Sequence, residues 1–238
     1  MRGFHIERIL VEIGVMIVAA FDLDDTLYKE IDFVKSGYRA IARMYASKIG
    51  CDEEEVYAVA WNAFLNDQNA IDAVMNHYPS DFTVAELVER YRNHIPEIVL
   101  PTKVKKILDE LVAKGFMLAI ITDGRSTTQR NKIAALGLDR MVSDDMVIIS
   151  EEVGCDKNKP DGFKALMDKV KDDDALLYYI GDNPEKDFYW PNKLGWTTIC
   201  LLDDGSNIHC QDFRQFGADY QPRYKINSID ELPPLLGA

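Results

Sequence analysis

The sequence has few positive charges, and this shortage excludes two kinds of partner. Lysine and arginine together number 27 against 40 aspartates and glutamates, which gives a formal net charge of -13. A chain with this charge repels the phosphates of nucleic acids and of anionic membranes, and no basic stripe offsets the repulsion. We therefore expect neither a nucleic acid nor a membrane as a partner.

Cysteine and histidine are scarce as well, and their spacing offers no metal or catalytic motif. The four cysteines, without a Cys-x-x-Cys pair among them, are Cys51, Cys155, Cys200 and Cys210. Reduced and mostly buried thiols in a cytoplasmic protein are the simplest interpretation. The four histidines are isolated from one another, so nothing supports a catalytic histidine.

A long hydrophobic run is missing too. Residues 9–21 are mostly apolar, but they include Glu12 and are shorter than the roughly 20 residues that a membrane-spanning helix needs. A signal peptide cleaved after Ala20 would remove the apolar run in front of Asp22, so we reject that interpretation. We interpret residues 1–15 as an N-terminal extension, either a short accessory helix or an over-long start of the sequence.

What the sequence does contain is an alternation of short apolar runs with helical patterns. The runs are residues 17–21, 116–121, 146–149, 176–180 and 197–201. Buried parallel strands have this appearance, and the helices between them cover both faces of the sheet. We predict an α/β fold with a Rossmann-like parallel sheet in the strand order 3-2-1-4-5 or similar.

The alternation is interrupted over residues 28–100, where only helical patterns occur. Asp52 with Glu55 and Thr83 with Glu86 have the spacing of helix N-terminal caps. Apolar residues behind these caps recur at the intervals of amphipathic helices. The interval therefore predicts a group of helices without a strand.

The length of this interval predicts one inserted domain. The stretch between the ends of the first and second strands is longer than a crossover helix needs, whereas the next interval leaves no room for a second insertion. We predict an all-helical cap over residues 31–95 and an α/β core formed by residues 16–30 and 96–238. Cap residues that are candidates to face the core are Lys35, Arg39, Asn62, Gln68 and Arg92.

Polar residues follow the predicted strands, and the carboxyl ends of parallel strands share one edge of a sheet. These polar segments are residues 22–26, 122–124, 157–160 and 181–187. Carboxylates at the mouth of a buried strand are costly unless a cation offsets their charge. We therefore expect one crevice that holds a hard cation and a phosphate.

The order of these residues resembles the four sequence motifs of the haloacid dehalogenase-like hydrolase superfamily. The matching patterns are Asp22-x-Asp24-x-Thr26, Thr122, Lys159-Pro160 and Gly181-Asp182-x-x-x-x-Asp187. Each pattern is weak by itself, but all of them occur in the family's order at or just after a predicted strand. The resemblance implies the phosphatase branch, with the helical cap inserted after the first motif.

The resemblance implies a reaction that passes through a covalent aspartyl-phosphate. Asp22 is implied to attack phosphorus, and Asp24 to protonate the leaving alkoxide and later to take a proton from the hydrolytic water. Both duties of Asp24 suit a raised pKa, which we expect from a crowded acidic pocket. Mg2+ is the implied cofactor, bound by Asp22, Asp182 and the backbone carbonyl of Asp24.

Further roles follow from the same resemblance. Thr122 is implied to hydrogen-bond a phosphoryl oxygen, and Lys159 to hold the nucleophile and the phosphate together. Lys157 is the alternative, and we favour Lys159 because it precedes Pro160 as in the family. The residues with implied supporting roles are Thr26, Asp123, Gly124 and Asp187, and we interpret Asp25 as a turn residue.

The sequence departs from the family after Asp187. Family members tend to carry a small Gly-Ala pair where this sequence has Trp190 and Pro191. We expect these larger side chains to alter the following helix or the rim of the site without touching the reacting groups.

The residues and the resemblance together predict Mg2+-dependent hydrolysis of a small phosphate monoester. Sugar phosphates, nucleoside monophosphates and phosphoglycolate-like acids are all open as substrates. A phosphosugar mutase of the same superfamily has the same chemical groups and is the main alternative. A 2-haloacid dehalogenase is disfavoured, because it lacks a counterpart of Asp24, since halide needs no proton. A non-catalytic scaffold is disfavoured as well, because it would not need all the catalytic groups that are intact here.

Overall fold

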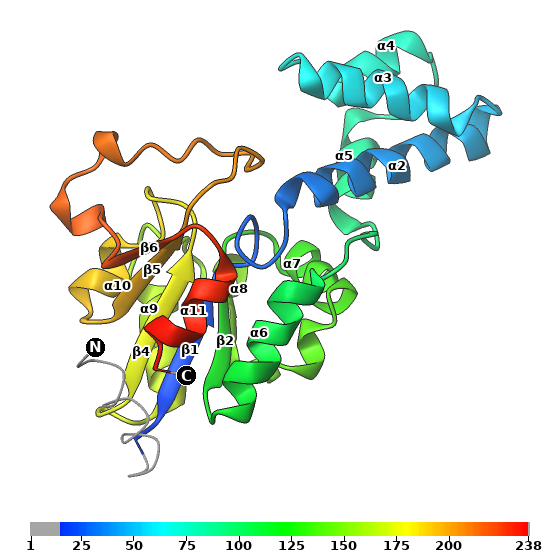
Figure 1. Ribbon diagram of the computed structural model, residues 1–238. Helices are drawn as coiled ribbons and strands as arrows, with labels where there is room; N and C mark the ends of the chain where they lie inside the picture. The colour runs from blue at the N-terminus through cyan, green and yellow to red at the C-terminus, as the bar shows by residue number, and fades with distance from the viewer. Residues whose placement is uncertain (1–14, 238) are drawn as a thin grey trace.

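The computed structural model describes residues 15–237, and in this part of the chain six parallel strands form one sheet. Their order, β3-β2-β1-β4-β5-β6, confirms the predicted arrangement and adds one strand at an edge (Figure 1). The strands are β1 (Ile17–Phe21), β2 (Met117–Thr122), β3 (Val147–Ile149), β4 (Leu176–Gly181), β5 (Thr197–Leu201) and β6 (Tyr224–Ile226). The sequence pattern missed β6 because only Ile226 of this short strand is buried.

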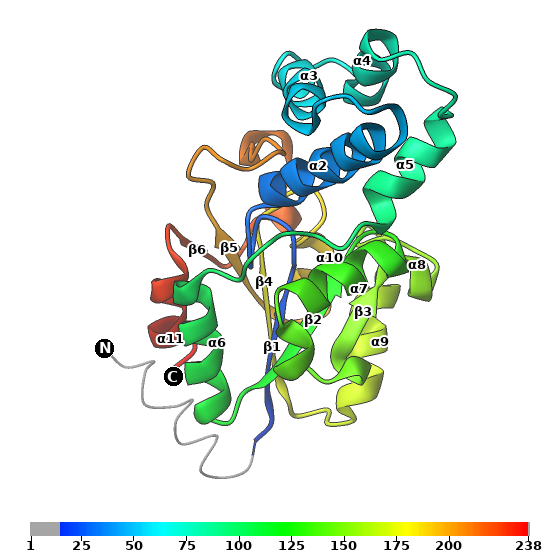
Figure 2. The ribbon, with the colours of Figure 1, turned by 90° about the vertical axis from the view of Figure 1, so that its right-hand side faces the viewer.

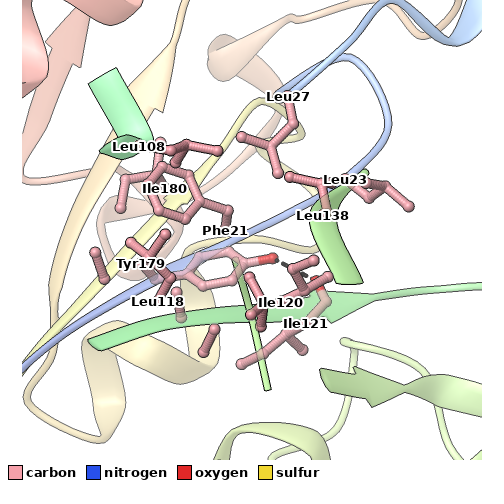
Figure 3. Close-up of a cluster of buried hydrophobic side chains, with 14 of the residues drawn as sticks. Phe21, Leu23, Leu27, Leu108, Leu118, Ile120, Ile121, Leu138, Tyr179 and Ile180 are labelled. Atoms are coloured by element: carbon pink, nitrogen blue, oxygen red, sulfur yellow. Dashed lines mark hydrogen bonds between the residues drawn. The ribbon is translucent and has the colours of Figure 1, made fainter. Parts of the chain in front are cut away.

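β1 lies at the centre of the sheet, where neighbouring strands cover both of its edges. All of its residues are buried, and Phe21 pairs with Ile120 of β2 and with Ile180 of β4. Figure 3 shows Phe21 and Tyr179 among the aliphatic side chains that surround this strand. A strand buried on both faces has a continuous apolar sequence. The first polar residue after β1, Asp22, therefore stands directly at the edge of the sheet.

Helices cover both faces of the sheet, as the alternation predicts. α6 (Thr102–Ala113) buries Val104 and Leu108 and packs with α11 (Leu232–Leu235) on one face, while α9 (Asp161–Val170) lies on the other (Figure 2). Ser228 and Glu231 form a capping box in the 3-10 turn that leads into α11. The remaining core helices are α7 (Ser126–Ala135), α8 (Ser150–Val153) and α10 (Tyr189–Lys193).

Between β1 and α6 the chain forms a group of helices, here called the helical insertion (residues 30–93). Its members are α2 (Glu30–Ile49), α3 (Glu53–Leu65), α4 (Ala70–His77) and α5 (Val84–Asn93). Asp52 caps α3 and Thr83 caps α5, both as predicted. The helices enclose their own buried cluster around Tyr45 and Leu87. Figure 1 shows them grouped beyond the edge of the sheet at which β1 ends.

Two further expectations concern the N-terminal extension and membrane-spanning helices. Of the N-terminal extension predicted over residues 1–15, residues 1–14 lie outside the described part of the chain. No helix within residues 15–237 combines the length and the apolar character required to cross a membrane.

Candidate active site

The polar residues at the carboxyl ends of β1, β2 and β4 line one small pocket, as expected for adjacent parallel strands. The side chains that the core contributes include Asp22, Asp24, Thr122, Asp123, Lys157 and Asp182. The helical insertion contributes Glu30, the first residue of α2. The predicted convergence of two acidic clusters, a threonine and a lysine is therefore present.

Asp22 and Lys157 form the innermost ion pair of the pocket. The Lys157 ammonium group donates to Oδ1 of Asp22 over 2.7 Å and to Oδ1 of Asp187 over 2.6 Å. It also lies 3.2 Å from the hydroxyl oxygen of Tyr179. Burial opposes the charge of Lys157, but Asp187 and Asp22 raise its pKa well above the ordinary value. Lys157 is therefore a permanent cation built into the site.

This arrangement corrects the choice of lysine. Lys159, which the family resemblance favoured, is exposed, and Lys157 occupies the place beside Asp22. The N–H of Lys159 donates to the carbonyl of Asp156 over 3.0 Å, so the chain turns between the two lysines. Asp123 holds this turn, because its Oδ1 accepts from the N–H of Lys157 over 3.0 Å. The turn, and not the neighbouring proline, decides which lysine points inward.

Three buried carboxylates beside this lysine present a donor set for a metal ion. Asp22, Asp182 and Asp187 have oxygen atoms within 4.8 Å of one another. Burial, which outweighs Lys157, raises the pKa of Asp22 to about 8. Burial together with Asp187 and Asp22 raises the pKa of Asp182 to about 9. One lysine is thus insufficient to offset these charges, and a hard divalent cation fits the oxygen donors.

Asp187 is fully buried, and protein donors occupy both of its oxygens. Oδ1 accepts from Lys157, and Oδ2 accepts from the N–H groups of Asp182 over 3.0 Å and of Asn183 over 2.8 Å. Gly181 permits this approach, since a Cβ at that position would overlap Oδ2 of Asp187. These contacts suit a residue that orients Asp182 from behind.

Asp24 is held by three donors that sequence reasoning missed. Nζ of Lys132 lies 2.8 Å from both carboxylate oxygens, Nε2 of Gln129 donates to Oδ2 over 3.1 Å, and the Tyr28 hydroxyl donates to Oδ1. Burial alone would raise the pKa of Asp24, but Lys132, Tyr28 and Gln129 outweigh it and lower the pKa. The expected rise is therefore wrong for this arrangement, because a buried cation contacts the carboxylate directly.

A signal for two of these donors is present in the sequence of α7. Gln129 and Lys132 lie one turn apart on this helix, and they are only 1% and 3% exposed. The segment 126–135 contains few apolar residues, although it connects two buried strands and must pack on the core. A core helix with so few apolar residues has to place polar side chains on its inner face.

The residues at the end of β2 contact the side chains that hold Asp24 and Lys157. The Thr122 hydroxyl oxygen accepts from Nε2 of Gln129 over 2.6 Å. Gly124 has a φ of 146°, and a Cβ there would lie 3.0 Å from Cδ of Gln129. Glycine is therefore needed both for the backbone conformation and for the close approach of Gln129. Asp123, besides holding the Lys157 turn, lies 3.4 Å from Nζ of Lys186.

A loop after β5 also reaches the site, which the sequence did not predict. Nδ2 of Asn207 donates to Oδ2 of Asp182 over 2.9 Å, and Thr26 Oγ1 lies 3.4 Å from Oδ1 of Asp182. Asp25 has the left-handed φ of a turn residue, 54°, but its Oδ2 also accepts from the N–H of Ile208 over 3.1 Å. Asp25 therefore holds this loop against the segment that follows β1.

The departure from the family at Trp190 has a visible consequence. Nε1 of Trp190 donates to the carbonyl oxygen of Asn158 over 2.8 Å, and Pro191 is buried within α10. The tryptophan thus joins α10 to the turn that carries Lys157. This contact involves the helix and the supporting backbone, and neither Trp190 nor Pro191 lines the pocket.

Two of the cap residues that were candidates to face the core are engaged within the helical insertion. Arg39 pairs with Glu54 over 2.7 Å and lies 4.2 Å from the ring centre of Tyr57. Lys35 lies 3.2 Å from Asp32 on the same helix. None of the five candidates lines the pocket in this arrangement, so the prediction that they face the core stays a prediction.

Comparison with known proteins agrees with this geometry. A sequence model described as haloacid dehalogenase-like hydrolase matches residues 19–200. A glyceraldehyde 3-phosphate phosphatase of Methanocaldococcus jannaschii is 29% identical over 223 residues, which cover 89% of this chain and 93% of the relative. A protein of the same name from Methanopyrus kandleri is 30% identical over 229 residues, covering 89% of this chain and 96% of the relative.

A solved structure shares the fold. The haloacid dehalogenase-like hydrolase from Bacillus subtilis, bound to magnesium, superposes with a TM-score of 0.60 at 19% identity. The superposition covers 94% of this chain and 100% of the other.

Proposed function

The chain belongs to the haloacid dehalogenase-like hydrolase family, and we propose that it hydrolyses small phosphate monoesters with Mg2+ through an aspartyl-phosphate on Asp22. It is a phosphoric monoester hydrolase, as are, by name, the two relatives that it matches over nearly their whole length. The observation that carries the finer proposal is the ion pair of Asp22 with Lys157 in a pocket that also contains Asp24 and Asp182. This pocket combines a nucleophile, a second carboxylate for proton transfer and a donor set for a metal.

In the first half-reaction, an oxygen of Asp22 forms a bond to phosphorus while the bond from phosphorus to the leaving oxygen breaks. Lys157 holds Oδ1 of Asp22, so the second oxygen is the one that attacks. Asp24 gives its proton to the leaving alkoxide. An incoming phosphate dianion disfavours the ionised form of Asp24, and it therefore counteracts the lowered pKa that Lys132 causes.

In the second half-reaction, Asp24 takes a proton from a water molecule whose oxygen bonds to phosphorus. The bond between phosphorus and the Asp22 oxygen breaks, which releases inorganic phosphate and restores the carboxylate. Thr122 accepts from Gln129, so its own hydroxyl hydrogen is available to a phosphoryl oxygen. Lys157 keeps the nucleophile in place through both steps.

Asp22 and Asp182 are the residues proposed to hold Mg2+, with Asp187 orienting Asp182 from behind. When bound, the ion supplies the positive charge that offsets the carboxylates and stabilises charge on the phosphoryl group. The raised pKa values of Asp22 and Asp182 support this assignment, because they indicate buried negative charge without sufficient compensation. The magnesium-bound structure of the same fold supports it as well.

We further propose that residues 31–95, which include all of the helical insertion except Glu30, act as a cap that reads the leaving group. α2 begins at Glu30, directly after the strand end that carries Asp22 and Asp24, and Glu30 itself lines the pocket. A cap in this position excludes water from the phosphorylated intermediate when it closes. The buried cluster within the insertion allows it to move as a unit.

The substrate class proposed is a small sugar phosphate. The pocket is lined mainly by charged and polar side chains and is small, which suits a short polyhydroxy group rather than a large apolar one. The names of the two relatives place glyceraldehyde 3-phosphate first in a panel of candidates. Nucleoside monophosphates and phosphoglycolate-like acids complete the panel.

The test is phosphate release from p-nitrophenyl phosphate and from this panel, with Mg2+ and with EDTA. We expect activity with Mg2+ and its loss both in EDTA and in Asp22→Asn, which keeps the shape of the side chain but not the nucleophile. Asp109→Asn is the matched control, because Asp109 lies exposed on α6 beside Lys105. Undiminished turnover of Asp22→Asn would overturn the covalent mechanism.

The same assay distinguishes hydrolysis from the mutase alternative. A hydrolase releases one phosphate for each substrate consumed and needs no bisphosphate primer. A phosphosugar mutase needs such a primer and returns an isomer with little free phosphate. Isomer without phosphate would assign the chain to the mutases.

A further inference from the structure

Lys132 is a buried cation to which the mechanism above assigns no role. Its side chain is 4% exposed, and its ammonium group lies 2.8 Å from both oxygens of Asp24. Burying an ammonium group is costly unless a partner offsets the charge. Here the partner is the residue proposed to transfer the proton. Lys132 therefore fixes the plane of the Asp24 carboxylate through two contacts at once.

Gln129 extends this contact to the phosphate-binding side of the pocket. Its Nε2 donates to Oδ2 of Asp24 over 3.1 Å and to Oγ1 of Thr122 over 2.6 Å. Gln129 and Lys132 are three positions apart and so share one face of α7. One helix thus holds the proton-transfer residue and the threonine hydroxyl in a fixed relation.

A side chain of the helical insertion covers the same contact. The ring centre of Phe33 on α2 lies 4.3 Å from Nζ of Lys132, and Phe33 is 5% exposed. An aromatic face attracts a cation and removes water from it, which strengthens the ion pair beneath. The position of α2 is therefore coupled to the Asp24–Lys132 pair.

We propose that Lys132 and Gln129 are positioning residues, which hold the Asp24 carboxylate in the orientation that transfers a proton to the leaving oxygen. The inference rests on the proposed phosphatase function and adds two residues outside the four motifs to it. An aspartate side chain turns about its own bonds, and proton transfer needs the donor oxygen within hydrogen-bonding distance of the leaving oxygen. A small misplacement of such a group lowers the rate strongly.

The test exploits the different need of two leaving groups for a proton. p-Nitrophenolate leaves without protonation, whereas phenolate, the stronger base, benefits from a proton donor. In Lys132→Met we expect kcat/KM, which reports the step in which the leaving group departs, to fall roughly 10²-fold for phenyl phosphate and roughly tenfold or less for p-nitrophenyl phosphate. Equal losses on both esters would overturn the positioning role, since general damage to the fold does not distinguish leaving groups.

Two variants keep this comparison interpretable. Lys105→Met makes the same change at an exposed position of α6, where the lysine pairs with Asp109, and it should match the wild type on both esters. If Lys132→Met does not fold, Lys132→Gln removes the charge with a polar side chain of similar length and is subject to the same two criteria.

A thermal unfolding cycle tests the pairing without reference to activity. Lys132→Met, Asp24→Asn and the double variant should be non-additive, with the double variant unfolding near the temperature of the less stable single variant. Additive effects would overturn the inference whatever the activity of the wild type. Failure of the wild type to hydrolyse either ester would instead count against the proposed function, and the cycle would still decide whether Lys132 holds Asp24.

Discussion

The ammonium group of Lys157 lies 2.7 Å from Oδ1 of Asp22, although 135 positions separate the two residues in the chain. The same group contacts Asp187, so that one buried cation serves two buried carboxylates. Removing it would leave both negative charges without their partner in a medium that solvates them poorly. This relationship makes the lysine the residue on which the charge balance of the site depends.

Lys157→Met should therefore lower kcat/KM for an aryl phosphate by roughly 10²–10³-fold, the range seen when one electrostatic contact to a reacting group is removed. Lys159→Met is the matched control, since it makes the same change two residues away at an exposed position. The measurement is steady-state kinetics on both variants, with circular dichroism to verify that each one folds. A larger loss in Lys159→Met would restore the assignment that the family resemblance favoured.

Mg2+ should stabilise the protein more at alkaline than at acidic pH. The pKa values of Asp22 and Asp182 are raised from 3.8 to about 8 and about 9. The folded protein thus binds these protons more tightly than the unfolded chain does, so the metal-free protein loses stability as the pH rises through this window. Mg2+ binds the ionised carboxylates and offsets that loss, because protons no longer compete with it.

The measurement is the shift in unfolding temperature on adding Mg2+, at about pH 6 and at about pH 8. The shift should be larger at the higher pH, and Asp182→Asn should reduce both the shift and its pH dependence. Asp109→Asn, at an exposed position on α6, should behave as the wild type. A shift that is equal at the two pH values, or larger at the lower one, would contradict the proposed metal site.

Gly37→Ala should destabilise the helical insertion, although alanine is the better helix former by about 1 kcal/mol. A Cβ at Gly37 of α2 would overlap the ring of Tyr91 on α5. Forcing an extra methyl group into such a contact costs about 1–3 kcal/mol, which exceeds the gain in helix propensity. We expect a lower unfolding midpoint in urea. A midpoint equal to or above that of the wild type would show that α2 and α5 separate easily.

Much of this protein follows from its sequence alone. The continuous apolar run of residues 17–21 predicts the central strand with its bounds, because a strand buried on both faces tolerates no polar side chain. The cap signals at Asp52 and Thr83 predict where α3 and α5 begin, because capping depends on residues only three positions apart. The order of the acidic strand ends predicts the pocket, because parallel strands all end at the same edge.

Other features were decided by the tertiary structure. Lys157 rather than Lys159 meets Asp22 because a turn orients two nearby side chains differently, and sequence spacing does not encode that direction. Lys132 reaches Asp24, and Asn207 reaches Asp182, only because helix packing and a long loop bring distant segments together. Local patterns report on neighbours within a few positions of the chain. Contacts between distant segments depend on how the elements pack, and here they set the charge and the orientation of each carboxylate in the site.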